Sequence, residues 1–278
     1  METLIELLKS LLFGVLEGIT EWLPISSTGH LILLNELVRL NVSDEFWSMF
    51  EVVIQLGAIL AVIVLFFHKL NPFAPSKSPD QKKTTWILWL KVVIAIIPSG
   101  IVGILLDDWM DAHLHTPVVV ATALIVYGIA FLFLEKLRPS HATPVRDVNQ
   151  VSCLTAFLIG CFQVLALIPG TSRSGSTILG AMLLGLSRSA AAEFSFFMAI
   201  PTMVGASGIK ALKFVLSGTP VSGIEWGVLT VGFVSAFLVS LAAIRFLMDF
   251  VKKHTFSAFG WYRIALGLLV LGWFFLFR

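Results

Sequence analysis

Charge is the scarcest property of this 278-residue sequence, since only 13% of its residues are Asp, Glu, Lys or Arg. A soluble protein carries roughly 25% charged and about 45–50% apolar residues, whereas 57% of this chain is hydrophobic. Several apolar runs reach the length needed to cross a bilayer, which is about 20 residues. The scarcity of charge therefore excludes an ordinary soluble domain and predicts an all-α polytopic membrane protein, with the lipid bilayer as its surroundings.

Cysteine and surplus basic charge are scarce as well. The two cysteines, Cys153 and Cys161, lie in one apolar segment and indicate neither a disulfide framework nor a metal site. The formal net charge is only +2 and no basic cluster is interleaved with aromatic residues, which argues against a nucleic-acid partner. The N-terminus has acidic residues before its apolar run and no small-residue cleavage site, so we expect it to belong to the mature protein.

Long apolar runs are what the sequence has in plenty, and six of them are expected to be full spans. Their approximate bounds are 48–68, 87–106, 117–135, 191–215, 226–247 and 258–277. Two further apolar stretches, about 3–40 and 151–188, are interrupted by LPISSTGH at 23–30 and IPGTSRSGST at 168–177. Because Pro and Gly interrupt helices, each of these stretches is predicted to form two half-helices joined by a polar, re-entrant turn.

Basic residues are distributed unevenly over the predicted loops. Lysine and arginine are frequent at 69–86, 136–150 and 248–257, whereas 107–116 carries three aspartates and neither Lys nor Arg. The positive-inside rule then places the three basic loops in the cytoplasm and the acidic loop outside. This orientation puts both termini outside and requires each interrupted stretch to return to the face it entered from. Lys210 and Lys213 would lie outside, against the rule.

The two halves of the chain resemble each other. GVLEGITEWLPISST at 14–28 aligns with GCFQVLALIPGTSR at 160–173 after one gap, so that Glu17 corresponds to Gln163 and Pro24 to Pro169. Each half continues with three spans, an odd number, which inverts the second half relative to the first. The pattern predicts one membrane domain, 1–278, with repeats at about 1–140 and about 150–278 whose broken helices meet near the midplane.

The first break carries ionisable groups at membrane depth, where a charge costs about 2.5–3.5 kcal/mol and marks a candidate site. Glu17 and Glu21 share one helix face, and two such carboxylates repel each other or recruit a cation such as Mg²⁺ or Ca²⁺. Beyond the proline come hydroxyl and imidazole groups that can bind an anion or serve as nucleophile and acid–base partner. They belong to Ser26, Ser27, Thr28 and His30. For Ser26 an ordinary helix N-cap is the alternative.

The second break supplies positive charge and further donors. Arg173 presents a planar fork of N–H groups suited to phosphate oxygens, although it could also merely neutralise Glu17 or Glu21. Around it lie backbone N–H groups and hydroxyls suited to an oxyanion, at Gly170, Thr171, Ser172, Ser174 and Thr177. No GK[ST] is present, so this is not a Walker A loop. Together the two breaks predict a site for a lipid phosphate, where metal and arginine neutralise charge around an in-line nucleophile.

Three segments, EGITEWLPISSTGH at 17–30, FEVVIQLG at 50–57 and PGTSRSGST at 169–177, resemble the signatures of the undecaprenyl-pyrophosphate phosphatase family of the bacitracin-resistance type. The similarity extends to EFSFFMAIP at 193–201 and to the pair Tyr262-Arg263. It implies an inner-membrane enzyme that releases phosphate from the C55 polyprenyl diphosphate and so recycles the carrier lipid for peptidoglycan synthesis. It also implies a divalent cation, an active site that faces the periplasm, and a homodimer among its states.

The same resemblance assigns roles to individual residues. It implies that Glu17 and Glu21 form the acidic motif, which would hold the metal, that Ser27 and His30 belong to the SSTGH motif, and that Arg173 binds phosphate. Whether Ser27 or His30 is the nucleophile stays open, with a preference for Ser27 activated by Glu21 or His30. Glu51 and Arg263 are further candidates, of which Arg263 would bind substrate, and each could instead be an ion pair that anchors helices.

Two other kinds of protein would share parts of this pattern. A lipid-phosphate flippase or transporter also uses inverted repeats and paired broken helices, but it does not need hydroxyls, an imidazole and paired carboxylates around a phosphate-binding fork. A structural membrane subunit would not need buried ionisable residues at all. The sequence therefore favours the phosphatase.

Overall fold

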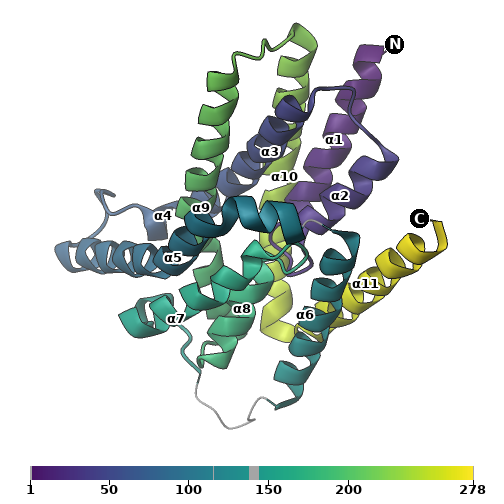
Figure 1. The fold of residues 1–278 in the computed structure, drawn as a ribbon. Coiled ribbons are helices and arrows are strands. Elements are labelled where there is room, and N and C mark those ends of the chain that lie inside the picture. Colours follow the sequence, from purple (N-terminus) through teal and green to yellow (C-terminus); the bar gives the residue numbers. More distant parts are fainter. Residues whose placement is uncertain (1, 115, 138–143, 278) are drawn as a thin grey trace.

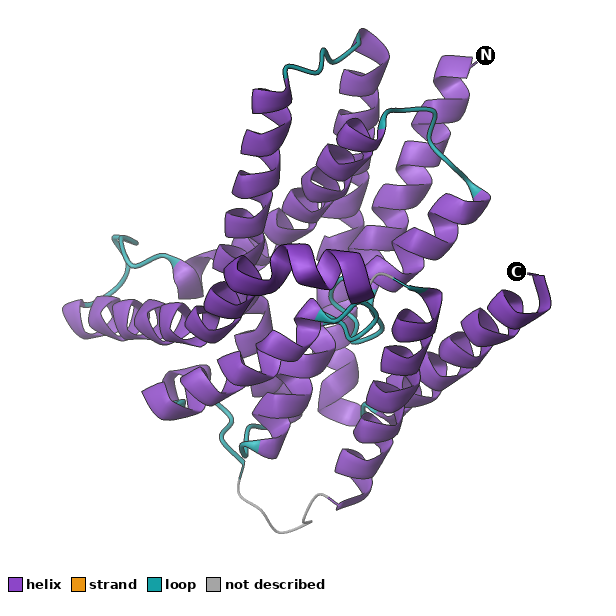
Figure 2. Cartoon of the chain, viewed as in Figure 1, coloured by secondary structure: helices purple, strands orange, loops and turns teal. Residues whose placement is uncertain are grey.

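The structure is a computed structural model that describes residues 2–114, 116–137 and 144–277, and these residues form helices and no strand (Figures 1 and 2). In chain order the helices are α1 (Glu2–Thr20), α2 (Ser27–Leu37), α3 (Asp44–Leu65), α4 (Phe67–Leu70), α5 (Pro79–Leu114), α6 (Pro117–Leu137), α7 (Cys153–Val164), α8 (Arg173–Leu183), α9 (Arg188–Ser217), α10 (Gly223–Lys253) and α11 (Ser257–Phe277). Two 3₁₀ turns, η1 (Val148–Gln150) and η2 (Leu165–Leu167), flank α7.

Six of these helices, α3, α5, α6, α9, α10 and α11, are long and apolar enough to cross a membrane. They coincide with the six predicted spans and make the chain a multi-pass membrane protein. The expected loop at 107–116 is wrong, because α5 continues to Leu114 and the next helix begins directly at Pro117. No proline or glycine interrupts the chain between 104 and 116, so nothing in that sequence stops the helix. The side chains of Asp107, Asp108 and Asp111 lie outside the described part of the chain.

The two predicted breaks are present, and proline accounts for both. A proline ring clashes with the carbonyl group four residues earlier, and α1 ends at Thr20, four residues before Pro24. In the second stretch α7 gives way to η2 at Leu165, four residues before Pro169. The interrupted stretches are therefore the helix pairs α1–α2 and α7–α8, as predicted.

The second helix of each pair begins in the same unusual way. Ser26 and Ser172 have φ angles of 74° and 72°, and in the described ranges they are the only residues other than glycine with positive φ. Each serine caps its helix, because its Oγ accepts a hydrogen bond from the backbone N–H of Gly29 (3.3 Å) or of Gly175 (3.1 Å). Backbone strain of this kind persists only where the surroundings enforce it and clusters at functional sites.

Packing between the two halves is reciprocal. Helix α1 packs on α10 as α7 packs on α5, while α3 pairs with α9 and α6 with α11. A Cβ atom on Gly128 would lie 2.7 Å from the carbonyl oxygen of Gly260, and one on Gly260 would lie 2.9 Å from that of Gly128. Such exchanged contacts are expected where a two-fold axis relates two units. They agree with a repeat, while its inversion in the membrane stays a prediction.

Aligned glycines of the two halves also lie at close contacts with a neighbouring helix. A Cβ atom on Gly14 would come within 2.0 Å of Ser235 Oγ on α10, and one on Gly160 within 2.0 Å of the carbonyl oxygen of Ala95 on α5. Small residues allow helices in a membrane to approach this closely. In Figure 1 the N-terminus of α1 and the α9–α10 connection lie at one end of the molecule, and the last turn of α6 lies at the other. The predicted topology likewise separates these segments, although which end faces the cytoplasm stays a prediction.

Candidate active site

The two turns that interrupt the helix pairs lie against each other near the middle of the molecule, where teal loops meet in Figure 2. Ser174 Oγ, at the start of α8, lies within hydrogen-bonding distance of the carbonyl oxygens of Glu21 (3.1 Å) and Leu23 (3.2 Å) in the first turn. The start of α8 is thereby joined to the turn that precedes α2. Unpaired N–H groups give helix N-termini a positive potential, so this arrangement favours an anion.

Arg263 of α11 joins both turns. Its side chain is fully buried, and its Nη1 donates to the carbonyl oxygen of Pro24 at 3.1 Å. Its Nη2 donates to the carbonyl oxygens of Gly170 (2.8 Å) and Thr171 (2.9 Å) in the other turn. These donors are committed to backbone carbonyls, so Arg263 ties the turns together. A contact between Arg263 and substrate, which the sequence predicted, stays a prediction.

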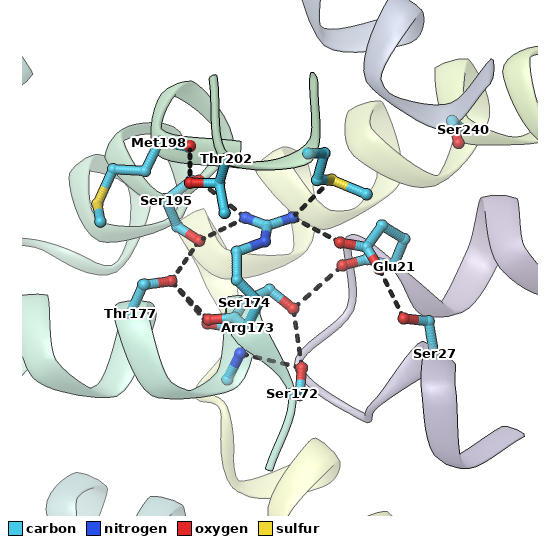
Figure 3. A network of polar contacts seen from close by, with 12 residues as sticks. Glu21, Ser27, Ser172, Arg173, Ser174, Thr177, Ser195, Met198, Thr202 and Ser240 are labelled. Atoms are coloured by element: carbon cyan, nitrogen blue, oxygen red, sulfur yellow. Dashed lines mark hydrogen bonds and ion pairs between the residues drawn. The ribbon is translucent and has the colours of Figure 1, made fainter. Parts of the chain in front are cut away.

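A chain of polar contacts runs through the centre of the site (Figure 3). Glu21 accepts a 2.6 Å hydrogen bond from Ser27 Oγ on its Oε2 and a 2.6 Å charge-assisted bond from Arg173 Nη2 on its Oε1. The side chains of Glu21 and Arg173 are only 8% and 12% exposed, so solvent screens the ion pair little. Ser27 therefore stands beside a carboxylate that can accept its proton, and that carboxylate is held by an arginine.

The other edge of Arg173 is held by α9. Its Nη1 donates to the carbonyl oxygen of Ser195 at 2.9 Å, and its Nη2 lies 3.9 Å from Met203 Sδ. Thr177 Oγ1 forms a 2.6 Å hydrogen bond with Ser195 Oγ, which fixes the start of α8 against α9 (Figure 3). Sequence reasoning missed Ser195 and Met203. The segment EFSFFMAIP, which contains Ser195, belongs to the family resemblance, but no pattern in it marks a backbone carbonyl group as an arginine ligand.

Glu17 is the unsatisfied group of the site. It is fully buried, and neither carboxylate oxygen has a hydrogen-bond partner in the structure. The charges of Glu21, Glu51 and Arg173 all lie close enough to act on it, so carboxylates outnumber the single guanidinium around it. An unpaired buried carboxylate is strongly disfavoured, and its two open oxygens are hard ligands of the kind that Mg²⁺ and Ca²⁺ bind.

A complete protein cage for a metal ion is not formed by the residues that the structure describes. No three His, Cys, Asp or Glu side chains converge there with metal-ligand geometry. Mg²⁺ usually binds through one or two carboxylates and takes its other ligands from water and substrate phosphate. The donor set at Glu17 therefore fits a cation that is shared with a phosphorylated substrate.

His30 is placed differently from Ser27. Its Nδ1 lies 2.6 Å from the carbonyl oxygen of Ser26, and its Nε2 lies 2.7 Å from the hydroxyl of Tyr262 on α11. The two rings meet edge to edge in nearly parallel planes, with centroids 5.7 Å apart. Both imidazole nitrogens are thus engaged away from the contact between Ser27 and Glu21. Of the two candidates for the nucleophile, only Ser27 contacts a carboxylate.

The remaining predicted site residues lie around these groups. Gly170 has φ +90° and a Cβ atom there would lie 2.4 Å from the carbonyl oxygen of Val120, so this turn needs glycine. Thr171 Oγ1 is buried without a hydrogen-bond partner, and Thr28 is exposed. For Ser26 and Ser172 the structure shows the N-cap role described above. Contact of these residues with substrate stays a prediction.

Comparisons with known proteins agree with this site. The family model described as bacitracin resistance protein BacA matches residues 10–269. A protein named undecaprenyl-diphosphatase from Streptococcus equi subsp. equi is 58% identical over 267 residues, which cover 96% of each chain. Proteins of the same name from Streptococcus pyogenes serotype M4 and Streptococcus thermophilus are 57% and 58% identical over 96% of this chain and 96% and 93% of their own.

Proposed function

The chain belongs to the bacitracin resistance protein BacA family, and from this premise we propose that it hydrolyses undecaprenyl diphosphate to undecaprenyl phosphate and inorganic phosphate. The observation that carries the proposal is that Glu21 accepts hydrogen bonds from both the Ser27 hydroxyl and the Arg173 guanidinium, so that a base links the hydroxyl to a positive charge. The shared name of the relatives favours this activity over a flippase of the same architecture. The reaction recycles the carrier lipid for peptidoglycan synthesis, which accounts for bacitracin resistance.

The first step is attack by Ser27 Oγ on the terminal phosphorus of the diphosphate. The new Oγ–P bond forms as the bridging P–O bond breaks, and undecaprenyl phosphate leaves with the electron pair of that bond. The Ser27 proton passes to Glu21 Oε2, with which it already shares a 2.6 Å hydrogen bond. Water then attacks the phosphoserine, inorganic phosphate leaves, and the proton on Glu21 returns to Ser27 Oγ.

Charge stabilisation comes from groups that the two turns place around Ser27. Phosphoryl transfer depends mainly on positioning and on neutralising the equatorial phosphate oxygens. Arg173 provides the fork of donors, and its Nε–H is buried without a partner, so one donor is free for a phosphate oxygen. The N-termini of α2 and α8, where Ser27 and Arg173 are the first helical residues, add backbone N–H groups to the same region.

Glu17 is the residue proposed to hold a divalent cation, Mg²⁺ or Ca²⁺, together with Glu21. When bound, the cation would neutralise phosphate oxygens beside the two carboxylates, which would otherwise repel the substrate. The support for it is the buried, unpartnered carboxylate of Glu17.

The site is further proposed to lie in the bacterial inner (cytoplasmic) membrane and to face the periplasm. The distribution of lysine and arginine over the predicted loops supports this orientation through the positive-inside rule. A homodimer, which the family resemblance implied, stays a prediction.

The decisive test is phosphate release by the purified protein from a polyprenyl diphosphate in the presence of Mg²⁺. We expect release by the wild type and a loss of at least about a thousandfold in Ser27→Ala, as found when a nucleophile is removed. Thr230→Ala, which removes an exposed hydroxyl on α10 outside the site, serves as the matched control. Absence of release by the wild type with every divalent cation tried would rule out the phosphatase, and an active Ser27→Ala would rule out Ser27 as the nucleophile.

Glu17→Gln tests the cation site. The aligned residue of the second half is Gln163, which is buried in the corresponding helix end, so the amide is compatible with this position in the fold. We expect a folded protein whose phosphate release falls at least about a hundredfold and whose Mn²⁺ binding, followed by electron paramagnetic resonance, is weakened by a similar factor. Unchanged Mn²⁺ affinity in this variant would show that the ion binds elsewhere.

A further inference from the structure

The contact between His30 and Tyr262 belongs to no step described so far. Tyr262 lies on α11, is 45% exposed, and meets His30 of α2 through its hydroxyl at 2.7 Å. The two ring planes are nearly parallel, at 6°. The neighbouring Arg263 points into the protein and binds both turns, so the pair Tyr262-Arg263 contacts both His30 of α2 and the two turns of the site.

The hydrogen bonds of His30 define which of its nitrogens carries the proton. A carbonyl oxygen can only accept, so Nδ1 must be the protonated nitrogen that donates to Ser26 at 2.6 Å. The Nε2 of the neutral ring is then an acceptor, and the Tyr262 hydroxyl must donate to it. The Ser26 carbonyl therefore selects the tautomer of His30, and the Tyr262 hydroxyl, as donor to Nε2, supports that tautomer and fixes the orientation of the ring.

The second half of the chain provides an internal comparison. Ser172 adopts the same strained conformation as Ser26, and its carbonyl oxygen accepts an ordinary helical hydrogen bond from Ser176 N at 3.0 Å. In the first half the equivalent bond, from His30 N to the Ser26 carbonyl oxygen, is longer at 3.3 Å, and the imidazole adds a second, shorter one. The serine turn thus forms without an imidazole in one copy, and only the copy that carries Ser27 has the additional grip.

We propose that Tyr262 is a positioning residue of the phosphatase site, which acts through His30. Its hydroxyl fixes the orientation of the imidazole, and the imidazole binds the carbonyl oxygen of Ser26, the residue with positive φ. The backbone of the next residue, Ser27, is thereby held so that its Oγ stays directed to Glu21. This inference rests on the proposed function. Displacement of Oγ by a fraction of an ångström lowers the rate of phosphoryl transfer more than it weakens substrate binding. Loss of the Tyr262 hydroxyl should therefore lower kcat and change KM little.

Tyr262→Phe tests this role, because it removes the hydroxyl and keeps the aromatic ring beside His30. We expect kcat to fall about tenfold, the effect of one hydrogen bond at the site, with KM changed less than twofold. The chain has two tyrosines, and Tyr127→Phe is the matched control: its ring lies 5.4 Å from the Arg263 guanidinium, and we expect its kcat to remain that of the wild type. An unchanged kcat in Tyr262→Phe would overturn the proposal.

Two further measurements separate positioning from general support of the fold. The kcat of the double variant His30→Ala, Tyr262→Phe should lie within twofold of the kcat of His30→Ala, because the effect of Tyr262 passes through the imidazole. A full tenfold loss there would show that Tyr262 acts independently. Nitrogen NMR of ¹⁵N-histidine-labelled protein, with His30 assigned by its disappearance in His30→Ala, should show an Nδ1–H tautomer whose Nε2 resonance shifts in Tyr262→Phe.

The NMR measurement needs no substrate. An Nε2 resonance that is unaffected by Tyr262→Phe would overturn the inference whatever the activity. A wild-type protein that shows the expected tautomer and shift but releases no phosphate would count against the proposed function, and with it against the kinetic role of Tyr262, while the contact itself stood. The two failures are therefore distinguishable.

Discussion

Replacement of Arg173 by lysine is expected to lower phosphate release at least about a hundredfold although the positive charge is kept. The guanidinium binds in two directions at once, to Glu21 through Nη2 and to Ser195 through Nη1, and it retains a free Nε–H. A lysine ammonium is a single point of charge on a flexible stem and cannot reproduce this planar fork. It would bind Glu21 or the phosphate, and the base beside Ser27 would lose its fixed position.

The measurement is kcat/KM for a polyprenyl diphosphate at saturating Mg²⁺, with Arg245→Lys as control. Arg245 is exposed on α10, so the same chemical change there should leave activity and thermal stability as in the wild type. A thermal unfolding midpoint of Arg173→Lys near that of the wild type would show that the loss is chemical. Should the lysine variant retain most of its activity, charge alone would be sufficient and the bidentate geometry would have no catalytic role.

The architecture was predictable because it depends on properties carried by each segment alone. Apolar runs of spanning length located the six long helices, and the prolines at 24 and 169 located the breaks through a clash with their own backbone. The prediction of a repeat rests on aligned residues such as Gly14 and Gly160, both of which lie at close helix crossings in the structure. The end of α5 differs from its prediction, because acidic residues favour a loop at 107–116 but no helix breaker accompanies them.

The parts of the site that the sequence did not reveal are contacts between distant segments. The carbonyl oxygen of Ser195 binds Arg173, and the hydroxyl of Tyr262 caps His30, and neither pairing follows from local spacing. Arg263 was recognised as a candidate, but its partners are carbonyl oxygens, which every residue has and no sequence pattern marks. The sequence shows which carboxylate, hydroxyl, imidazole and guanidinium groups are candidates for the site, whereas it does not show the backbone and side-chain groups that orient them.

The two halves divide the work of the site unequally. Glu17 has an open carboxylate among charged neighbours, whereas the aligned Gln163 donates from Nε2 to Ser99 Oγ at 2.5 Å and to Thr202 Oγ1 at 3.3 Å. One helix end therefore leaves a buried carboxylate open, and its counterpart crosslinks α7 to α5 and α9. The two aligned positions thus hold different groups, a free carboxylate in one half and a hydrogen-bonded amide in the other.

Arg263→Met is expected to destabilise the folded protein more strongly than Arg173→Lys. The methionine would fill much of the space but leave the carbonyl oxygens of Pro24, Gly170 and Thr171 without their donor. A buried acceptor left unsatisfied costs about 1–3 kcal/mol, so three such groups cost about 3–9 kcal/mol. The variant no longer has to bury a charged guanidinium, which offsets part of this loss of stability. The remaining loss is still large compared with a total stability of about 5–15 kcal/mol.

Thermal unfolding of the detergent-solubilised protein measures the effect, with Arg245→Met as the exposed control. Arg263→Lys should fall between the wild type and Arg263→Met, because an ammonium has three donors but cannot reach both turns as a planar fork does. If Arg263→Met unfolded at the wild-type temperature, the contacts of Ser174 with Glu21 and Leu23 would be sufficient to join the turns. A lowered midpoint would instead identify a buried cation, shared among backbone carbonyls of both halves, as what holds the two broken helices in one site.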